Sequence, residues 1–166
     1  MRGIVFVAAL ALAGCGSKTE HHLKGDDGTD VKVETSKAGE TAVITTTNPD
    51  GTTSRLENGG RWPDGLAGLA PAYPGATILT TATTDQNGEK SVMGSFETKD
   101  APAKIIAFYK PLAEAAGLKG TMNMETGEMS MFAATDEKTG RSLSIQVAVE
   151  DSKATGIVSF VTKKPE

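Results

Sequence analysis

Apolar and polar residues alternate through much of the second half of this chain. In "RSLSIQVAVE", for example, every second residue from Leu143 to Val149 is apolar. A period of two is typical of a strand that has one covered face. The segment "DAPAKIIAFYKPLAEAAG", from Asp100 to Gly117, instead repeats its apolar residues every three or four positions, which indicates an amphipathic helix. The pattern therefore predicts several strands and one helix.

Two of the predicted strands flank Asn87-Gly88, the dipeptide that most strongly favours a two-residue hairpin turn. That turn places Asp85 opposite Lys90 and Leu79 opposite Phe96, both sensible cross-strand pairs. Further strands are predicted after the helix in "EMSMFAATD", "RSLSIQVAVE" and "TGIVSFVTK". Residues 76–166 are therefore predicted to form an α+β domain, an antiparallel sheet with one helix packed on one face, in the order ββαβββ.

The ends of the predicted helix carry recognisable signals. Asp100 is the expected N-cap, Pro102 lies in the first turn, and Gly117 closes the helix. Pro111 interrupts the apolar pattern. Because proline lacks a backbone N–H and its ring collides with the preceding turn, we expect Pro111 to kink the helix or to end its first segment.

The first half of the chain is poorer in apolar residues. Residues 31–57 are rich in Thr and Val and predict a small β meander, whose apolar content is too thin to fold alone. Residues 58–75 carry many Gly and Pro and predict an irregular linker, which Trp62 and Tyr73 attach to the domain. Residues 15–30 are polar and Gly-rich, as in a flexible tether.

The first fourteen residues have the architecture of an export signal. A positively charged start is followed by "GIVFVAALALA", an apolar run too short to span a bilayer in the mature protein. The run ends in "LAGC", which resembles the lipobox of bacterial lipoproteins. The resemblance implies cleavage before Cys15 and attachment of diacylglycerol, with chains such as palmitate, to the Cys15 sulfur. With Gly16 rather than Asp in the next position, it also implies the outer membrane, facing the periplasm.

The cysteine count agrees with an anchor at this position. Cys15 is the only cysteine of the chain, so an intramolecular disulfide and a cysteine-based zinc cluster are both excluded. The alternative is an ordinary signal peptide cut near Ala13, which would leave an unpaired thiol in an oxidising compartment. Two or three acyl chains on Cys15 would make attachment to the membrane effectively permanent.

A second resemblance covers the C-terminal part of the chain. The segments "YPGA" and "SFETKDAPAKIIAFYKPLAEAAG" are similar to small exported bacterial α+β domains of uncharacterised function. That likeness implies a fold of this kind, and it supplies no catalytic residues.

The segment "MNMETGEMSM" places Met122, Met124, Met129 and Met131 around a predicted turn. A four-residue loop would put all four on one face of the sheet, whereas a three-residue loop with Gly127 in the left-handed conformation would divide them between the faces. We favour the second register and an apolar floor for the helix, because methionine is an adaptable core residue. The alternative is a site for Cu(I) or another soft metal, since thioethers are soft ligands.

Charge and motifs exclude several function classes. The net charge of −4 has no basic stripe, which argues against nucleic-acid binding. Both histidines, His21 and His22, lie in the predicted tether, so the body lacks the base of Ser-His-Asp or Cys-His chemistry. The tether is expected to be too mobile to hold a metal through these histidines. Two carboxylate pairs remain, and both are interpreted as solvated loop charges: Asp136 with Glu137, and Glu125 with Glu128.

These observations together predict a non-enzymatic, lipid-anchored binding or structural module of the cell envelope that needs no cofactor. Its expected partners are the membrane, through the N-terminal anchor, and an envelope protein or a glycan. The contact is expected on an open sheet face or an edge strand, and the alternating Ser142, Ser144 and Gln146 indicate that such a face is wet.

Overall fold

The computed structural model describes residues 19–36 and 41–163 of the chain. Strands make up 56% of these residues and helices 13%. The strands are β1 Thr19–Lys24, β2 Asp30–Thr35, β3 Ala42–Thr47, β4 Thr53–Asn58, β5 Thr77–Gln86, β6 Glu89–Thr98, β7 Lys119–Glu125, β8 Met129–Asp136, β9 Arg141–Glu150 and β10 Lys153–Thr162. The helices are α1 Asp64–Ala67 and α2 Pro102–Ala115. The predicted leader 1–14 and Cys15 lie outside the described residues.

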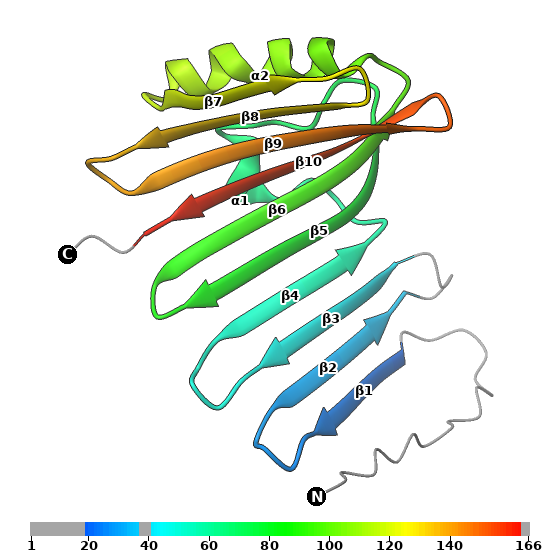
Figure 1. The fold of residues 1–166 in the computed structure, drawn as a ribbon. Coiled ribbons are helices and arrows are strands. Elements are labelled where there is room, and N and C mark those ends of the chain that lie inside the picture. Colours follow the sequence, from blue (N-terminus) through cyan, green and yellow to red (C-terminus); the bar gives the residue numbers. More distant parts are fainter. Residues whose placement is uncertain (1–18, 37–40, 164–166) are drawn as a thin grey trace, which may run out of the picture.

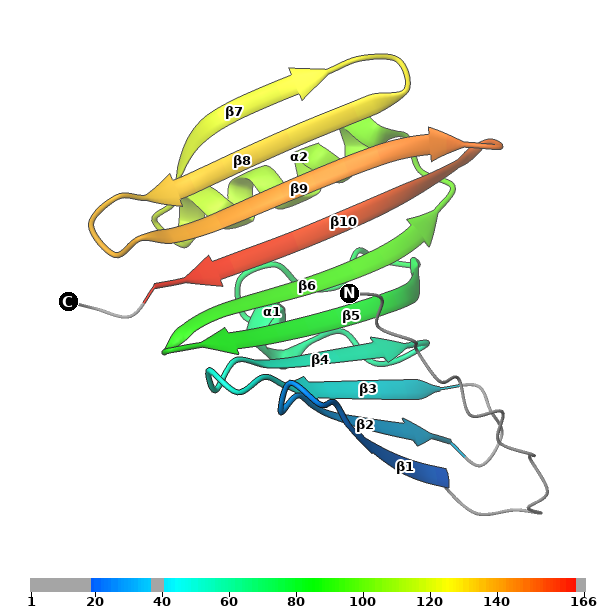
Figure 2. The ribbon, with the colours of Figure 1, turned by 60° about the horizontal axis from the view of Figure 1, so that its bottom comes forward.

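The ten strands form one antiparallel sheet in the order β1-β2-β3-β4-β5-β6-β10-β9-β8-β7 (Figure 1). Strands β1 to β6 follow one another along the chain as a meander. Helix α2 then crosses over to the far edge, and β7 to β10 return strand by strand until β10 pairs with β6. Both helices lie on the same side of the sheet (Figure 2). We call this side the helix face and the opposite side the open face.

The predicted fold class is wrong. An α+β domain of order ββαβββ, preceded by a separate small β meander, was expected, whereas the observed fold is dominated by one continuous sheet. Four strands rather than three follow α2. Strands β1 to β4 add to the edge of the same sheet, because β4 pairs with β5 from Thr53↔Asp85 to Asn58↔Thr80. Edge-to-edge pairing satisfies the backbone of β4 without the apolar core that these strands lack.

Two of the predicted segments also differ from the structure. Thr19–Lys24 is strand β1, which pairs with β2, so a flexible tether over 15–30 is wrong for the residues described. The predicted linker 58–75 contains the short helix α1, which packs on β6 at Gly65. A Cβ on Gly65 would lie 3.0 Å from a methyl group of Val92, so the close approach depends on the glycine.

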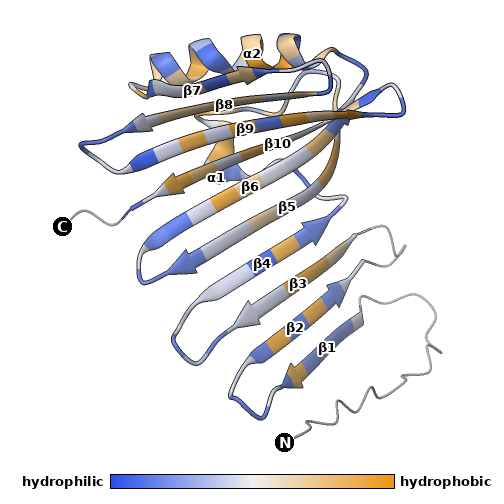
Figure 3. Ribbon diagram, in the orientation of Figure 1, coloured by the Kyte–Doolittle hydropathy of each residue, from blue (hydrophilic) through white to orange (hydrophobic). Residues whose placement is uncertain are grey.

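The core lies between the helices and strands β6, β10, β9 and β8. Hydrophobic and hydrophilic residues alternate along the strands, as Figure 3 shows for β9. The apolar set of β9, Leu143, Ile145 and Val147, is buried on the helix face beside Phe132 of β8. In contrast, no residue of β1, β2 or β3 is fully buried, because no helix covers this part of the sheet.

The predicted β5–β6 hairpin is confirmed, with one error in its pairing. Asn87 and Gly88 both adopt positive φ, and Asp85 pairs with Lys90 as expected. Leu79, however, does not face Phe96. A register shift at this position places Ile78 opposite Phe96 and leaves the Leu79 side chain exposed.

Helix α2 begins differently from the prediction. Its N-cap is Ala101, and the expected cap Asp100 instead accepts hydrogen bonds from the Lys104 ammonium group, at 2.9 Å, and from the Tyr73 hydroxyl. The helix does not end at Pro111, which lies exposed within it. Gly117 follows the helix with a φ of 80°, the left-handed conformation typical of a helix end.

Candidate functional site

An aromatic cluster fills the space between the sheet and the segments that cover it: Trp62, Tyr73, Phe96, Phe108 and Tyr109. Phe96 and Tyr109 have no exposed surface, and their ring centroids lie 6.4 Å apart. The Tyr73 ring stacks on Phe96 at 5.7 Å. Because these rings fill the interior next to the sheet, a ligand can bind only on the surface around the cluster.

Two hydrogen bonds from this cluster tie residues 59–76 to α2 and to Asp100 just before it, and a third lies within the segment. The Tyr109 hydroxyl donates to the carbonyl of Pro71 at 3.0 Å, and the Tyr73 hydroxyl donates to Asp100 at 2.8 Å. The Trp62 indole N–H donates to the carbonyl of Ala70 at 2.8 Å. The Trp62 ring also packs on Phe96 of β6, at a centroid distance of 6.1 Å. The predicted role of Trp62 and Tyr73 in attaching this segment is therefore confirmed, and the segment forms a fixed wall beside the sheet.

The burial of both tyrosines predicts the behaviour of the protein in alkali. Burial, and then the hydrogen bond to Asp100, raises the pKa of Tyr73 to about 12, and burial also raises the pKa of Tyr109. An unfolded tyrosine has a pKa near 10. Because both folded pKa values are raised, the contribution to stability is complete below about pH 10 and is lost as the pH rises through the folded values.

We therefore expect no tyrosinate absorbance near pH 10 in the folded protein, since the chain contains only these two tyrosines. Ionisation should coincide with loss of the near-ultraviolet circular dichroism signal at higher pH. The urea-unfolded chain serves as the control and should titrate near pH 10, as free tyrosine does. Reversible ionisation of either tyrosine near pH 10 without unfolding would contradict the packing described above.

A surface groove of about 410 Å³ lies on the helix face, between α1 and strands β4, β5 and β6. We call it the β4–β6 groove. Its lining includes Arg55, Glu57, Arg61, Trp62, Thr83 and Lys90. One wall is therefore the fixed segment that holds Trp62, and the floor is the sheet.

Strand alternation explains why these groups face one another. Arg55 and Glu57 are two residues apart on β4, and Arg55 lies opposite Thr83 of β5, so all three point to the helix face. The Arg55 guanidinium donates to the Glu57 carboxylate at 3.0 Å. The groove thus combines an aromatic ring, a threonine hydroxyl and several charged groups of both signs, which together can orient a polar ligand.

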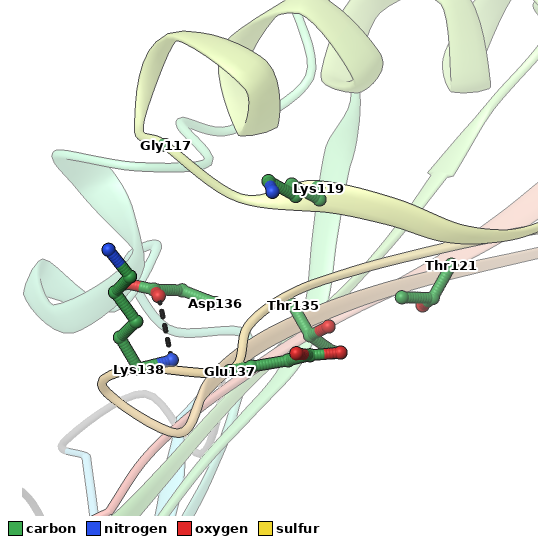
Figure 4. Close-up of a pocket in the computed structure, with 7 residues that line it drawn as sticks. All are labelled: Gly117, Lys119, Thr121, Thr135, Asp136, Glu137 and Lys138. Carbon is green, nitrogen blue, oxygen red and sulfur yellow. Dashed lines mark hydrogen bonds between the residues drawn. The ribbon is translucent and has the colours of Figure 1, made fainter.

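A second pocket, of about 350 Å³, opens where α2 ends and β8 turns into β9 (Figure 4). Lys119, Glu137 and Lys138 line it with exposed side chains. Asp136 is already occupied by hydrogen bonds: it accepts from the Thr139 hydroxyl and from the Arg141 guanidinium, at 2.6 and 3.0 Å. Arg141 also donates to the carbonyl of Ala116 after the helix. The arrangement ties the β8–β9 turn to the end of α2 and is structural.

The two predicted carboxylate pairs have different surroundings in the structure. The Thr139 hydroxyl, and then Arg141, lowers the pKa of Asp136 to about 2, so the solvated and unperturbed carboxylate expected for this position is wrong. A lowered pKa makes Asp136 a poor proton donor or base near neutral pH. Glu137, Glu125 and Glu128 are exposed, as expected for surface charges.

The four methionines lie on the open face, so the predicted apolar floor for α2 is wrong. Met124 pairs with Met131, and Met122 pairs with Ala133. Neither of the two predicted registers is observed. Instead, the Thr126 hydroxyl bonds both the amide and the carbonyl of Met129, at 3.0 and 2.9 Å, and closes the turn around Gly127 and Glu128. This turn sets the register that places all four methionines on one face.

The two histidines cannot act together on a metal. His21 and His22 are adjacent in β1, so their side chains point to opposite faces of the sheet. His22 instead contacts Glu20 at 2.8 Å. Across residues 19–36 and 41–163, no group of three or more His, Cys, Asp or Glu side chains is arranged to hold a metal ion.

Sequence reasoning missed the charged residues of the β4–β6 groove. Arg55 and Thr83 are far apart in the sequence, and only the pairing of β4 with β5 brings them together. Trp62, the single tryptophan of the chain, is the one signal in the sequence, and its predicted role there is attachment of the linker alone.

Neither helix of the described residues has the length and apolar character needed to cross a membrane.

Comparison with known proteins identifies one family over the C-terminal half of the chain. None of the curated proteins and none of the solved structures compared with the chain matches it. The family model described as START domain-like matches residues 78–165, from β5 to the C-terminal end, which is more than half of the 166 residues. The chain therefore belongs to the START domain-like family.

Proposed function

We propose that this protein is an exported, lipid-anchored module of the bacterial cell envelope that acts by binding a ligand rather than by catalysis. The observation that carries the proposal is the family match over residues 78–165, because START-like domains are generally binding domains rather than enzymes. The "LAGC" sequence ending at Cys15 supports the anchor. Acylation of Cys15 with two or more chains would hold the protein on the membrane permanently.

The β4–β6 groove is the proposed ligand site, and its chemistry fits a glycan. A sugar ring has an apolar face of C–H groups and a rim of hydroxyls. The Trp62 ring supplies a flat apolar surface, while Arg61, Thr83 and Glu57 supply donors and acceptors around it. The open shape of the groove suits a polymer strand, which an enclosed cavity would exclude.

The position of the anchor brings the sheet close to the membrane. Cys15 precedes the first described strand residue, Thr19, by four residues, which span at most about 14 Å when fully extended. At most four residues therefore separate the proposed anchor from strand β1.

The anchor is tested by Cys15→Ser. The unaltered protein should incorporate labelled palmitate and sediment with membranes, and the variant should lose both properties because serine offers no thiol for acylation. The protein with Gly16→Ala, which keeps the thiol, is the matched control and should remain membrane-bound. Labelled lipid on the Cys15→Ser protein would contradict the anchor.

The ligand site is tested with residues 16–166, which include every residue that the structure describes. Trp62 is the only tryptophan and lines the groove, so its fluorescence reports occupancy directly. Soluble peptidoglycan fragments should change this fluorescence to saturation. Arg61→Ala should weaken binding by about tenfold or more, since a hydrogen bond to a charged group contributes roughly 1.5–3 kcal/mol.

The matched control for Arg61→Ala is Lys138→Ala, which removes an exposed cation in the other pocket and should leave binding unchanged. Three outcomes would overturn the glycan site: no saturable fluorescence change, equal weakening by both variants, or recovery of only a protein partner on crosslinking in intact cells. Hydrolysis of the fragments by the protein would contradict the binding function and indicate an enzyme.

A further inference from the structure

The methionine face of the β7–β8 hairpin is a feature that the proposed function does not use. Four of the six methionines of the chain lie there: Met122, Met124, Met129 and Met131. Residues directly opposite each other share a face, as do alternate residues of one strand, so the register places all four on the open face. Phe132, which lies next to Met131 in β8, points to the opposite face and is buried under α2.

These methionines contribute little to the core. Met122 is 51% exposed, Met129 39% and Met124 38%, and Met131 is half-buried. Strand β7 is an edge strand whose residues are all exposed. Leucine or valine would fill a strand position as well as methionine, and threonine would suit the solvent better. The concentration of sulfur at this edge therefore has no explanation in packing.

The spacing of the four positions allows their sulfur atoms to converge. Met124 and Met131 form a direct cross-strand pair, with Cβ atoms about 4.5–5.5 Å apart in such geometry. Met122 is diagonal to Met131, and Met129 is diagonal to Met124, at roughly 7–8 Å. Three rotatable bonds in each side chain let three or four sulfurs reach one point above the central pair.

The surroundings of this cluster favour a soft, singly charged ion. The open-face residues opposite the cluster on β9, and Ile157 beyond them on β10, are uncharged: Ser144, Gln146, Ala148 and Ile157. The exposed Glu150 follows Ala148 on the same face at the end of β9, where it pairs with Lys153. Calcium, magnesium and zinc bind through carboxylate, imidazole or thiolate groups, and thioethers select Cu(I). We propose that Met122, Met124, Met129 and Met131 form a binding site for Cu(I).

The site is independent of the β4–β6 groove and of the anchor, and it can be tested on residues 16–166. In an anaerobic competition with a coloured Cu(I) chelator, the protein should take up one Cu(I) per chain. Replacement of all four methionines by leucine conserves volume and should keep the fold. It should weaken Cu(I) binding by at least about 100-fold, the upper end of the loss seen when only an outer-shell partner is removed. Met93→Leu, on the same face but on β6, should change nothing.

A second measurement keeps the proposal testable if the fourfold variant does not fold. Ag(I), an air-stable analogue of Cu(I), should shift the methyl NMR signals of these four methionines and leave that of Met93 in place. Met124→Leu alone should weaken binding by about tenfold. The proposal is overturned if the protein fails to compete with the chelator, if the fourfold variant binds as tightly as the original, or if Zn(II) binds as tightly as Cu(I). It is overturned equally if the methionine face captures a protein partner and takes up no metal.

Discussion

Phe96→Ala is expected to destabilise the protein by about 3–5 kcal/mol, the range seen when a buried phenylalanine is truncated. The Phe96 side chain is fully buried, stacks on Tyr73 and contacts the edge of Trp62, at centroid distances of 5.7 and 6.1 Å. Its removal would leave a cavity in the middle of the aromatic cluster. The rigid sheet beneath and the fixed segment above leave little freedom for the site to collapse.

The measurement is urea unfolding followed by circular dichroism, with the midpoint expected to fall at an unchanged slope. Phe160→Ala is the matched control, since Phe160 is only partly buried at the margin of the same core. Its loss should cost less than half as much. An equal loss of unfolding free energy for the two variants would contradict the central place of the aromatic cluster in the core. A loss below about 1 kcal/mol for Phe96→Ala would contradict it as well.

The second large effect is expected for Gly156→Ala on β10. Gly156 pairs with Phe96, and a Cβ at this position would overlap the Phe96 ring. The φ angle of Gly156 is not positive, so alanine fits the backbone and the strain comes from the ring alone. Overpacking of this kind costs about 1–3 kcal/mol, although alanine in a strand otherwise gains roughly 0.5–1 kcal/mol over glycine.

A double-mutant cycle separates ring overlap from other causes. Phe96→Leu removes ring atoms, so Gly156→Ala should cost less in that background than alone, with a coupling of about 0.5–3 kcal/mol. Gly68→Ala is the control with the opposite sign. Gly68 has a φ of −78°, and no atom lies within 4 Å of the place that a methyl group would take, so alanine there should be neutral or stabilising. Additive costs for Phe96→Leu and Gly156→Ala would contradict the overlap.

Both candidate sites depend on strand register, which the sequence alone does not determine. The four methionines were identified as a group, but their face was predicted wrongly because the Thr126 side chain closes the turn and shifts the register. A shift of one residue moves a whole strand's side chains to the other face. The groove was missed for a related reason, since Arg55 and Thr83 meet only through β4–β5 pairing.

The sequence by itself determined the local features of this protein: the alternation along β9, the Asn87-Gly88 turn, the approximate extent of α2 and the role of Trp62 and Tyr73 in fixing the linker. Each depends on a residue's own backbone preference or on side chains within one short segment. Only the tertiary structure decided that β1 to β4 extend one ten-stranded sheet and that the methionines lie on its open face. Those outcomes depend on backbone hydrogen bonds between distant, Thr-rich strands of similar composition, whose pairing and register the apolar pattern does not distinguish.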